Sequence, residues 1–260
     1  MIENHVVMYS SGKASFVAAY LVAKKYGTEN LTLLFADTKI EDESNYKFLE
    51  EGAKYLGAKL EVVADGRTPW EVFEDTKWIN HRSANCSKYL KQIPCREWLE
   101  NKKELTPENT TLYVGIDFNE YERMTGILKG WHPWKVEAPL CWGDEWIDRE
   151  QVNQIIVQAG LTPSKLYGQG FSHANCGGFC IRAGKAHFRN LLEVNPDLYK
   201  YHEQKEQQFR KAIDNYEVGI LRQTRNGITK GLTLKDFRET LESEPKQLDL
   251  LDWGGCGCFS

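Results

Sequence analysis

A serine- and glycine-rich stretch near the amino terminus has residues suited to binding a phosphate. The chain reads Ser10-Ser11-Gly12-Lys13-Ala14-Ser15 between an apolar run, Val6–Tyr9, and a stretch from Ser15 with apolar residues at helical spacing. Such a loop aims backbone N–H groups at one spot, where the helix that follows contributes a positive partial charge. The three serines add hydroxyl donors and Lys13 adds a charge. The loop therefore predicts an anion site, and its spacing is neither that of a Walker A loop nor that of a Rossmann fingerprint.

Cysteine is the second residue type that points to chemistry. The chain of 260 residues has seven cysteines, Cys86, Cys95, Cys141, Cys176, Cys180, Cys256 and Cys258. No apolar run approaches the roughly 20 residues of a membrane span, and the first residues do not read as a signal peptide. We therefore expect a cytoplasmic protein without a membrane contact, in a compartment that keeps thiols reduced. Metal, cluster or catalytic work is then the favoured use of the cysteines.

The elements that must position these residues alternate along the chain. Apolar runs at 6–9, 31–35, 60–63, 112–114 and 136–140 predict strands, and amphipathic stretches at 15–26, 41–56, 86–98 and 148–159 predict helices. This alternation indicates an α/β fold, a doubly wound and mostly parallel sheet with helical cover. Residues 198–216 and the stretch opened by the capping box at Thr233 predict a helical carboxyl-terminal appendage. We expect a domain at 1–190 and an appendage with a cysteine-containing tail at 191–260.

Three segments together resemble the PP-loop ATP pyrophosphatases and the phosphoadenosine phosphosulfate (PAPS) reductase branch. Residues 10–15 resemble the S-G-G-x-x-S loop, with Ser11 in place of a glycine. Residues 35–43 resemble the D-T-G-x-x-x-P-E-T stretch, with Lys39 in place of its glycine, and residues 113–123 resemble a strand that ends in glycine and leads to an arginine. The resemblance covers roughly Val6 to Phe188 and implies an adenine nucleotide α-hydrolase-like, PP-loop fold.

The resemblance also implies a set of site residues. It assigns ATP binding to Ser10, Ser11, Gly12, Lys13, Ser15, Asp37, Thr38 and Gly115, and catalytic roles to Lys13, Asp37 and Arg123. Asp37 would hold a ribose hydroxyl or a metal, Gly115 would let adenine approach the backbone, and Arg123 would contact a phosphate or sulfate. Mg²⁺ would neutralise the leaving pyrophosphate.

Two cysteine segments resemble those of cluster-bearing reductases. Residues 82–95 have one cysteine, Cys86, where cluster-bearing members have a pair, and residues 166–180 have C-x-x-x-C where those members have C-x-x-C. The implied ligands are Cys86, Cys176 and Cys180, for a [4Fe–4S] cluster or, alternatively, zinc. Two glycines between Cys176 and Cys180 would let the chain wrap an ion. The fourth ligand stays open between Cys95, Cys256, Cys258, His173 and an external group.

The tail and the function have alternatives. Cys256 and Cys258 resemble the mobile cysteine tail of PAPS reductases and could act as nucleophile or persulfide carrier. The favoured function is an ATP pyrophosphatase that adenylates an acceptor for sulfur insertion, closest to the DNA-phosphorothioation branch, with a nucleic-acid acceptor and a cysteine desulfurase-like sulfur donor as partners. The alternatives are a thioredoxin-dependent PAPS or adenylyl-sulfate reductase that makes sulfite, and a non-enzymatic nucleotide sensor. The charge balance, 33 basic and 37 acidic residues, shows no global basic field.

Overall fold

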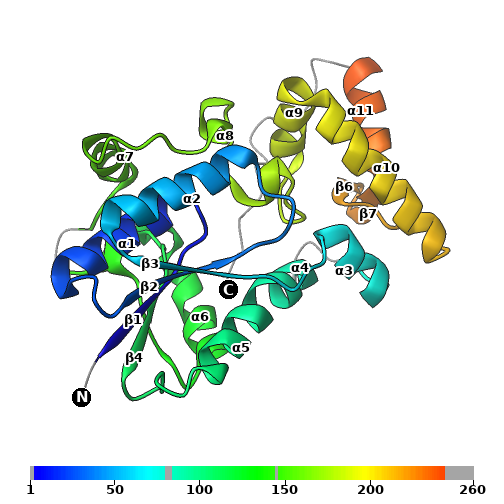
Figure 1. Ribbon diagram of the computed structural model, residues 1–260. Coiled ribbons are helices and arrows are strands. Elements are labelled where there is room, and N and C mark those ends of the chain that lie inside the picture. Colours follow the sequence, from blue (N-terminus) through cyan, green and yellow to red (C-terminus); the bar gives the residue numbers. More distant parts are fainter. Residues whose placement is uncertain (1–2, 80–83, 144–145, 244–260) are drawn as a thin grey trace.

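The centre of the molecule is a five-stranded parallel sheet (Figure 1). A computed structural model describes residues 3–79, 84–143 and 146–243. The strands lie in the order β3-β2-β1-β4-β5. Their bounds are β1 (Asn4–Met8), β2 (Leu31–Ala36), β3 (Lys59–Val63), β4 (Thr110–Tyr113) and β5 (Lys135–Glu137). Because β2 and β3 extend to one side of β1 whereas β4 and β5 extend to the other, the connection direction reverses between β1 and β4.

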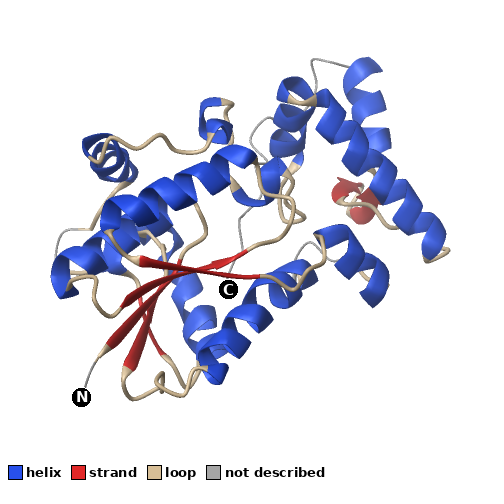
Figure 2. Cartoon of the chain, in the orientation of Figure 1, coloured by secondary structure: helices blue, strands red, loops and turns tan. Residues whose placement is uncertain are grey.

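Helices cover both faces of this sheet, as Figure 2 shows. One face packs against α1 (Lys13–Tyr26), α2 (Glu43–Leu56) and α7 (Arg149–Gln158), and the other against α5 (Ile93–Asn101) and α6 (Met124–Trp131). Successive strand residues point to opposite faces, so Val7 belongs to the first core and Met8 to the second. The predicted doubly wound α/β fold is confirmed.

The predicted helix at 86–98 forms as three consecutive pieces. They are α4 (Asn85–Ser87), the π-helical turn η1 (Lys88–Gln92) and α5, which has Pro94 in its first turn. Proline has no backbone N–H to donate to the preceding turn, and a widened π turn is one way in which a helix accommodates such a loss. The sequence located this helix correctly, and the proline accounts for its irregular middle.

Short elements connect the larger helices and strands. They are α3 (Pro69–Thr76), η2 (Phe118–Arg123), η3 (Pro139–Cys141), α8 (Lys165–Gly168) and η4 (Asn175–Gly178). Several helix ends are capped by side chains. Asp148 caps α7 by accepting a hydrogen bond from the Gln151 backbone N–H at 2.8 Å, as predicted. No helix within the described residues has the length and apolar character needed to cross a membrane.

The last described part of the chain, residues 185–243, adds three helices and one hairpin. The helices are α9 (Lys185–Val194), α10 (Pro196–Ala212) and α11 (Leu234–Ser243), and the hairpin pairs β6 (Leu221–Arg225) with β7 (Ile228–Leu232). The predicted helical appendage is present, but the prediction missed the hairpin. Its turn is Asn226-Gly227, with φ of +50° and +76°, which is the turn sequence favoured by two-residue hairpins. The hairpin lies beside α10 in Figure 1.

A third core joins this part to the rest of the molecule. It contains Trp70 of α3 and Phe179, the residue that follows η4, together with side chains of α9, α10, α11 and the hairpin. The boundary at residue 190 stays a prediction, and this core has members on both sides of it.

A buried carboxylate ties the hairpin and α11 to α10. Glu206 is fully buried, and its two oxygens accept hydrogen bonds from the backbone N–H groups of Ile220 and Leu234, each at 2.7 Å. Burial raises the pKa of Glu206 to about 7, although both hydrogen bonds lower it. This carboxyl group therefore titrates near neutral pH.

Candidate nucleotide and cysteine site

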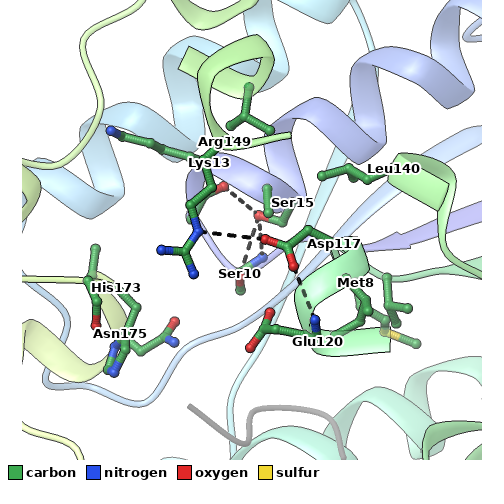
Figure 3. Close-up of a pocket in the computed structure, with 18 of the residues that line it drawn as sticks. Met8, Ser10, Lys13, Ser15, Asp117, Glu120, Leu140, Arg149, His173 and Asn175 are labelled. Carbon is green, nitrogen blue, oxygen red and sulfur yellow. Dashed lines mark hydrogen bonds and ion pairs between the residues drawn. The ribbon is translucent and has the colours of Figure 1, made fainter. Parts of the chain in front are cut away.

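A cavity of about 550 Å³ lies where the connection direction of the sheet reverses. Ligands of doubly wound folds bind at this position, beyond the carboxyl ends of the strands. We call it the switch-point cavity (Figure 3). Among the residues that line it are Ser10, Gly12, Lys13 and Ser15 after β1, Gly115, Asp117, Glu120 and Arg123 after β4, Arg149 and Asn153 of α7, and Tyr167, Ser172, His173 and Asn175.

The predicted anion loop forms one wall of this cavity. Gly12 is the N-cap residue of α1 and no side chain caps the helix there. The Ser15 hydroxyl donates to the Gly12 carbonyl at 2.8 Å and accepts from the Ser10 backbone N–H at 3.2 Å. These bonds close the loop into a compact turn that faces the cavity with the positive end of the helix dipole.

Ser11 has a backbone conformation that favours glycine, the residue that the resembled family has at this position. It is buried, lies at φ of +58° and does not line the cavity. This left-handed conformation strains any residue with a Cβ atom. The Ser11 hydroxyl donates to the Ser10 carbonyl at 2.6 Å and holds the turn locally.

We expect Ser11→Gly to be more stable than Ser11→Ala by about 1 kcal/mol. Both substitutions delete the hydroxyl, so the contrast isolates the backbone conformation. Urea unfolding of the two variants beside the native chain measures this difference. Equal stabilities of the glycine and alanine variants would contradict the strained conformation at this position.

Charges of both signs face the switch-point cavity. Lys13 donates to the Asn153 side-chain oxygen at 2.9 Å, and its Nζ lies 4.4 Å from the centre of the Tyr167 ring. Arg123 pairs with Glu120 at 2.7 Å. Burial lowers the pKa of Lys13.

The remaining charged pair lies at the mouth of the cavity. Arg149 Nε lies 3.9 Å from an Asp117 carboxylate oxygen, and the Arg149 side chain is 79% exposed. The three cations suit the phosphates of a nucleotide, and the two carboxylates suit a hard cation such as Mg²⁺.

Gly115 lets two parts of the cavity wall approach closely. A Cβ atom at this position would lie 2.6 Å from the Ser15 backbone nitrogen and 2.8 Å from the Ala14 carbonyl carbon. No real Cβ atom makes such contacts with backbone, so only glycine allows the end of β4 to pack against the first turn of α1. Gly115 also lines the cavity, as the predicted contact with adenine requires.

Asp37 and Thr38 follow β2 and lie outside the group that lines the switch-point cavity. Asp37 accepts hydrogen bonds from the Lys39 backbone N–H at 2.8 Å, from Lys39 Nζ at 2.8 Å and from the Tyr46 hydroxyl at 2.7 Å. Burial raises the pKa of Asp37, but these hydrogen bonds outweigh it and the net pKa is lowered. A role for Asp37 on ribose or metal stays a prediction.

The three cysteines predicted as metal ligands line one small cavity. Cys86 from α4 meets Cys176 and Cys180, about ninety residues away along the chain. The cavity, which we call the cysteine cavity, has a volume of about 30 Å³. Thr38, the buried Lys91 and Arg182 also line it.

The cysteine loop, residues 172–180, is fixed to the segment after β2. Cys176 donates its backbone N–H to a Glu41 carboxylate oxygen at 2.8 Å, and Asn45 donates its side-chain N–H to the Ala174 carbonyl at 2.6 Å. At Gly177 a Cβ atom would lie 2.4 Å from the Ile40 carbonyl oxygen. This close approach requires glycine and fixes the loop that carries the two thiols against the segment after β2.

The same loop lines both cavities. Ser172, His173, Ala174 and Asn175 face the switch-point cavity, whereas Cys176 and Cys180 face the cysteine cavity. Burial lowers the pKa of His173 to about 3, with smaller effects of His187 and Lys91 in the same direction. His173 is therefore neutral at physiological pH, and its ring stacks on that of His187 at 5.3 Å.

The residue types at the cysteine cavity suit a metal ion, whereas the spacing of their side chains does not. Three thiols beside Lys91 and Arg182 are a donor set for a thiophilic ion or cluster. Within residues 3–79, 84–143 and 146–243, however, no three histidine, cysteine or carboxylate side chains are grouped closely enough to hold a metal. The cavity that the three thiols line is small, with a volume of about 30 Å³.

Two further cysteines of the described residues, Cys95 and Cys141, lie elsewhere. Cys95 is buried in the core below the sheet, and burial raises the pKa of its thiol to about 12. Cys141 is half-buried and donates weakly to the Ile116 carbonyl at 3.6 Å. Neither lines the cysteine cavity. Cys256 and Cys258 lie outside the described residues.

Sequence reasoning assigned no site role to several residues of the switch-point cavity, among them Asp117, Glu120, Arg149, Asn153 and Tyr167. Arg149 and Asn153 lie one helical turn apart on α7, which carried a clear capping signal at Asp148. No local pattern placed that helix beside Lys13, because the two segments meet only through packing of α7 on α1.

Comparisons with known proteins relate part of the chain to one family. Residues 4–107 match the sequence model of the phosphoadenosine phosphosulfate reductase domain. A search of curated proteins found no match.

Solved structures give weaker similarities. A PAPS reductase from Candida auris in a phosphate complex has 14% identity, covers 66% of this chain and 79% of its own, and has a TM-score of 0.45. A U34-tRNA thiolase, NcsA, from Methanococcus maripaludis with its [4Fe–4S] cluster has 16% identity, coverage of 92% and 82%, and a TM-score of 0.42. A predicted tRNA methyltransferase subunit from Methanocaldococcus jannaschii has 21% identity, coverage of 64% and 92%, and a TM-score of 0.33.

The matched segment, residues 4–107, contains the anion loop, the residues after β2 and Cys86. Over this segment the chain is similar to the phosphoadenosine phosphosulfate reductase domain.

Proposed function

We propose that this chain is an ATP pyrophosphatase that activates an acceptor for sulfur insertion in the cytoplasm. ATP would occupy the switch-point cavity, and sulfur would be delivered from the side of the cysteine cavity. The observation that carries the proposal is the cysteine loop, because its residues 172–175 line one cavity and Cys176 and Cys180 line the other. A nucleotide and a thiol-borne sulfur would thus be neighbours across a single loop.

The phosphates would be held by the anion loop. The backbone N–H groups at the start of α1 and the hydroxyls of Ser10 and Ser15 are the donors, and Lys13 supplies a charge beside them. Arg123 and Arg149 would contact the α-phosphate and the leaving pyrophosphate. Asp117 and Glu120 are the carboxylates in reach of a Mg²⁺ ion on those phosphates.

The proposed reaction has two displacements. An acceptor oxygen attacks the α-phosphorus, the bond from that phosphorus to the bridging oxygen breaks, and pyrophosphate leaves. Sulfide then attacks the activated atom, and AMP leaves with the original acceptor oxygen. Where a cysteine desulfurase-like donor supplies the sulfur as a persulfide, a dithiol reductant first reduces that persulfide by two electrons to release the sulfide. No net oxidation or reduction occurs when the sulfur arrives as sulfide. The cations around the cavity stabilise the negative charge that develops on the phosphate oxygens.

Cys86, Cys176 and Cys180 are the residues that would hold a [4Fe–4S] cluster or zinc. The group would supply a site where sulfur is bound and presented as a nucleophile. Lys91 and Arg182 line the same cavity and would offset the negative charge of the thiolates.

Lys13→Gln tests the proposed nucleotide site. We expect pyrophosphate release from ATP, measured with sulfide and with mixed DNA or tRNA as acceptor, to fall by about 10²-fold or more in kcat/KM. Lys24→Gln is the matched control, since Lys24 is exposed at the far end of the same helix. Unchanged turnover in Lys13→Gln would place the phosphates elsewhere.

A thioredoxin-dependent PAPS reductase is the second candidate, because the matched family model is that of the PAPS reductase domain. The two activities are separated by their products, pyrophosphate from ATP or sulfite from PAPS with thioredoxin. Sulfite release that depends on Cys256 or Cys258 would favour the reductase. ATP binding without turnover in either assay would favour a nucleotide sensor.

A further inference from the structure

The β6–β7 hairpin carries a concentration of positive charge. From Val218 to Lys235 the sequence contains Arg222, Arg225, Lys230 and Lys235 and no acidic residue. The whole chain, in contrast, has a net charge of −4. The acidic residues that flank this run, Glu217 and Asp236, lie at the base of the hairpin, where Asp236 is engaged by the Thr233 hydroxyl at 2.7 Å.

The hairpin is anchored at its base and exposed beyond it. Ile220 and Leu221 are buried in the third core, and Leu232 packs against that core. Glu206 fixes the same end through the Ile220 backbone N–H. From residue 222 to 231 the side chains described are exposed, apart from that of Gln223, which is half-buried.

The strand register places basic residues on both faces of this ribbon. Arg222 lies opposite Gly231, and Gln223 lies opposite Lys230. Because neighbouring residues of a strand point to opposite faces, Arg222 and Lys230 lie on different faces. Thr224 and Thr229 form a cross-strand pair with hydroxyl oxygens 2.9 Å apart.

This composition matches one class of partner. Lysine and arginine neutralise phosphates, and arginine, glutamine, asparagine and threonine are the side chains that pair with base edges. A two-stranded β-ribbon fits the major groove of B-form DNA, which is about 12 Å wide, whereas the major groove of A-form RNA is too narrow for it. Ile228 is the one large apolar side chain that the described part of the ribbon exposes, so an apolar row for a membrane surface is lacking there.

We propose that the β6–β7 hairpin is a binding element for double-stranded DNA, inserted into the major groove with Arg222 and Lys230 on the phosphates or guanine edges. As a statement about the acceptor of sulfur, this rests on the proposed function. The binding itself requires neither ATP nor sulfur, and it is measured without them.

The test is the salt dependence of binding to a fluorescent mixed-sequence duplex of about 25 base pairs, followed by anisotropy from about 50 to 200 mM NaCl. The native chain should bind in the micromolar range at the lowest salt. The double variant Arg222→Gln and Lys230→Gln should bind at least about tenfold more weakly, and its slope of log K against log salt should be smaller by about 2. Both side chains are exposed, so thermal unfolding should show an intact fold.

Matched variants and competitors make the result decisive. Lys103→Gln with Lys129→Gln removes the same charge from exposed positions after α5 and on α6 and should leave binding unchanged. Equal affinity and slope for the hairpin variant and the native chain would overturn the proposal, as would stronger binding to an RNA duplex or to anionic vesicles. Lys13→Gln should still bind the duplex, so a failure of the ATP proposal is seen separately.

Discussion

Replacing Cys86, Cys176 or Cys180 by serine is expected to remove bound metal from the protein and to leave ATP binding intact. Each of the three thiols lines the cysteine cavity, and serine cannot supply a thiolate at neutral pH. We expect iron, zinc and acid-labile sulfide per chain, measured after anaerobic purification, to fall by at least about tenfold in each variant. Equilibrium dialysis of ATP should give an unchanged affinity, because the three thiols lie outside the switch-point cavity.

Cys141→Ser is the matched control for this experiment. Its thiol is half-buried and donates weakly to a backbone carbonyl, and it is not part of the cysteine cavity. It should keep the metal content of the native chain. A protein that binds no iron or zinc in its native form, or keeps its metal after all three cavity cysteines are replaced, would rule out this site. Cys256→Ser and Cys258→Ser then test the tail cysteines as a fourth ligand.

The second large effect is a loss of stability in mild acid. His202 is buried, accepts a hydrogen bond from Trp70 Nε1 on its Nδ1 at 3.0 Å and stacks on Phe179 at 3.9 Å. Burial lowers its pKa to about 3. Burial also lowers the pKa of His187 to about 4 and is the largest cause of the lowered pKa of His173.

The sign of the effect follows from which state takes up protons. In the unfolded chain each histidine binds a proton below its ordinary pKa of about 6.5, whereas the folded chain keeps these three neutral. The stability that these neutral histidines contribute is therefore fully present above about pH 6.5. It is lost as the pH falls, by up to about 1.4 kcal/mol per pH unit and per histidine. Glu206 has the opposite effect on stability between the pKa of an unfolded glutamate and its folded pKa of about 7, because there the folded chain binds the extra proton. Because three histidines oppose one glutamate, the free energy of unfolding falls by about 2 kcal/mol per pH unit near pH 5.5.

Urea unfolding at about pH 7.5 and about pH 5.5, followed by tryptophan fluorescence, measures this loss. His202→Asn offers an amide oxygen near the place of Nδ1 as acceptor for Trp70 and does not titrate. It should reduce the difference between the two pH values by about 1 kcal/mol, although it lowers stability at both. His132→Asn, at an exposed position, should leave the difference unchanged. A native chain that is equally stable at both pH values would show that the buried histidines are not held neutral.

Patterns within a few residues determined much of this protein. The strand, serine-rich loop and helix at residues 6–26, the cap of α7 at Asp148 and the alternation that gives a parallel sheet were all predictable, because apolar spacing and capping act within one or two turns. The hairpin turn at Asn226-Gly227 carried an equally local signal, and the sequence analysis missed it because the surrounding residues were assigned to helices. The grouping of Cys86 with Cys176 and Cys180 was implied by family resemblance and not by any local pattern.

Tertiary packing decided the rest of the site. Arg149 and Asn153 reach the switch-point cavity because α7 packs against α1, and the cysteine loop reaches it because Gly177 allows contact with the backbone at Ile40. Two contacts of this kind join segments more than a hundred residues apart, and their geometry depends on the volumes buried between them. Sequence alone therefore determined which groups can bind a phosphate or carry sulfur, whereas only the packed structure decided that one loop lines both cavities.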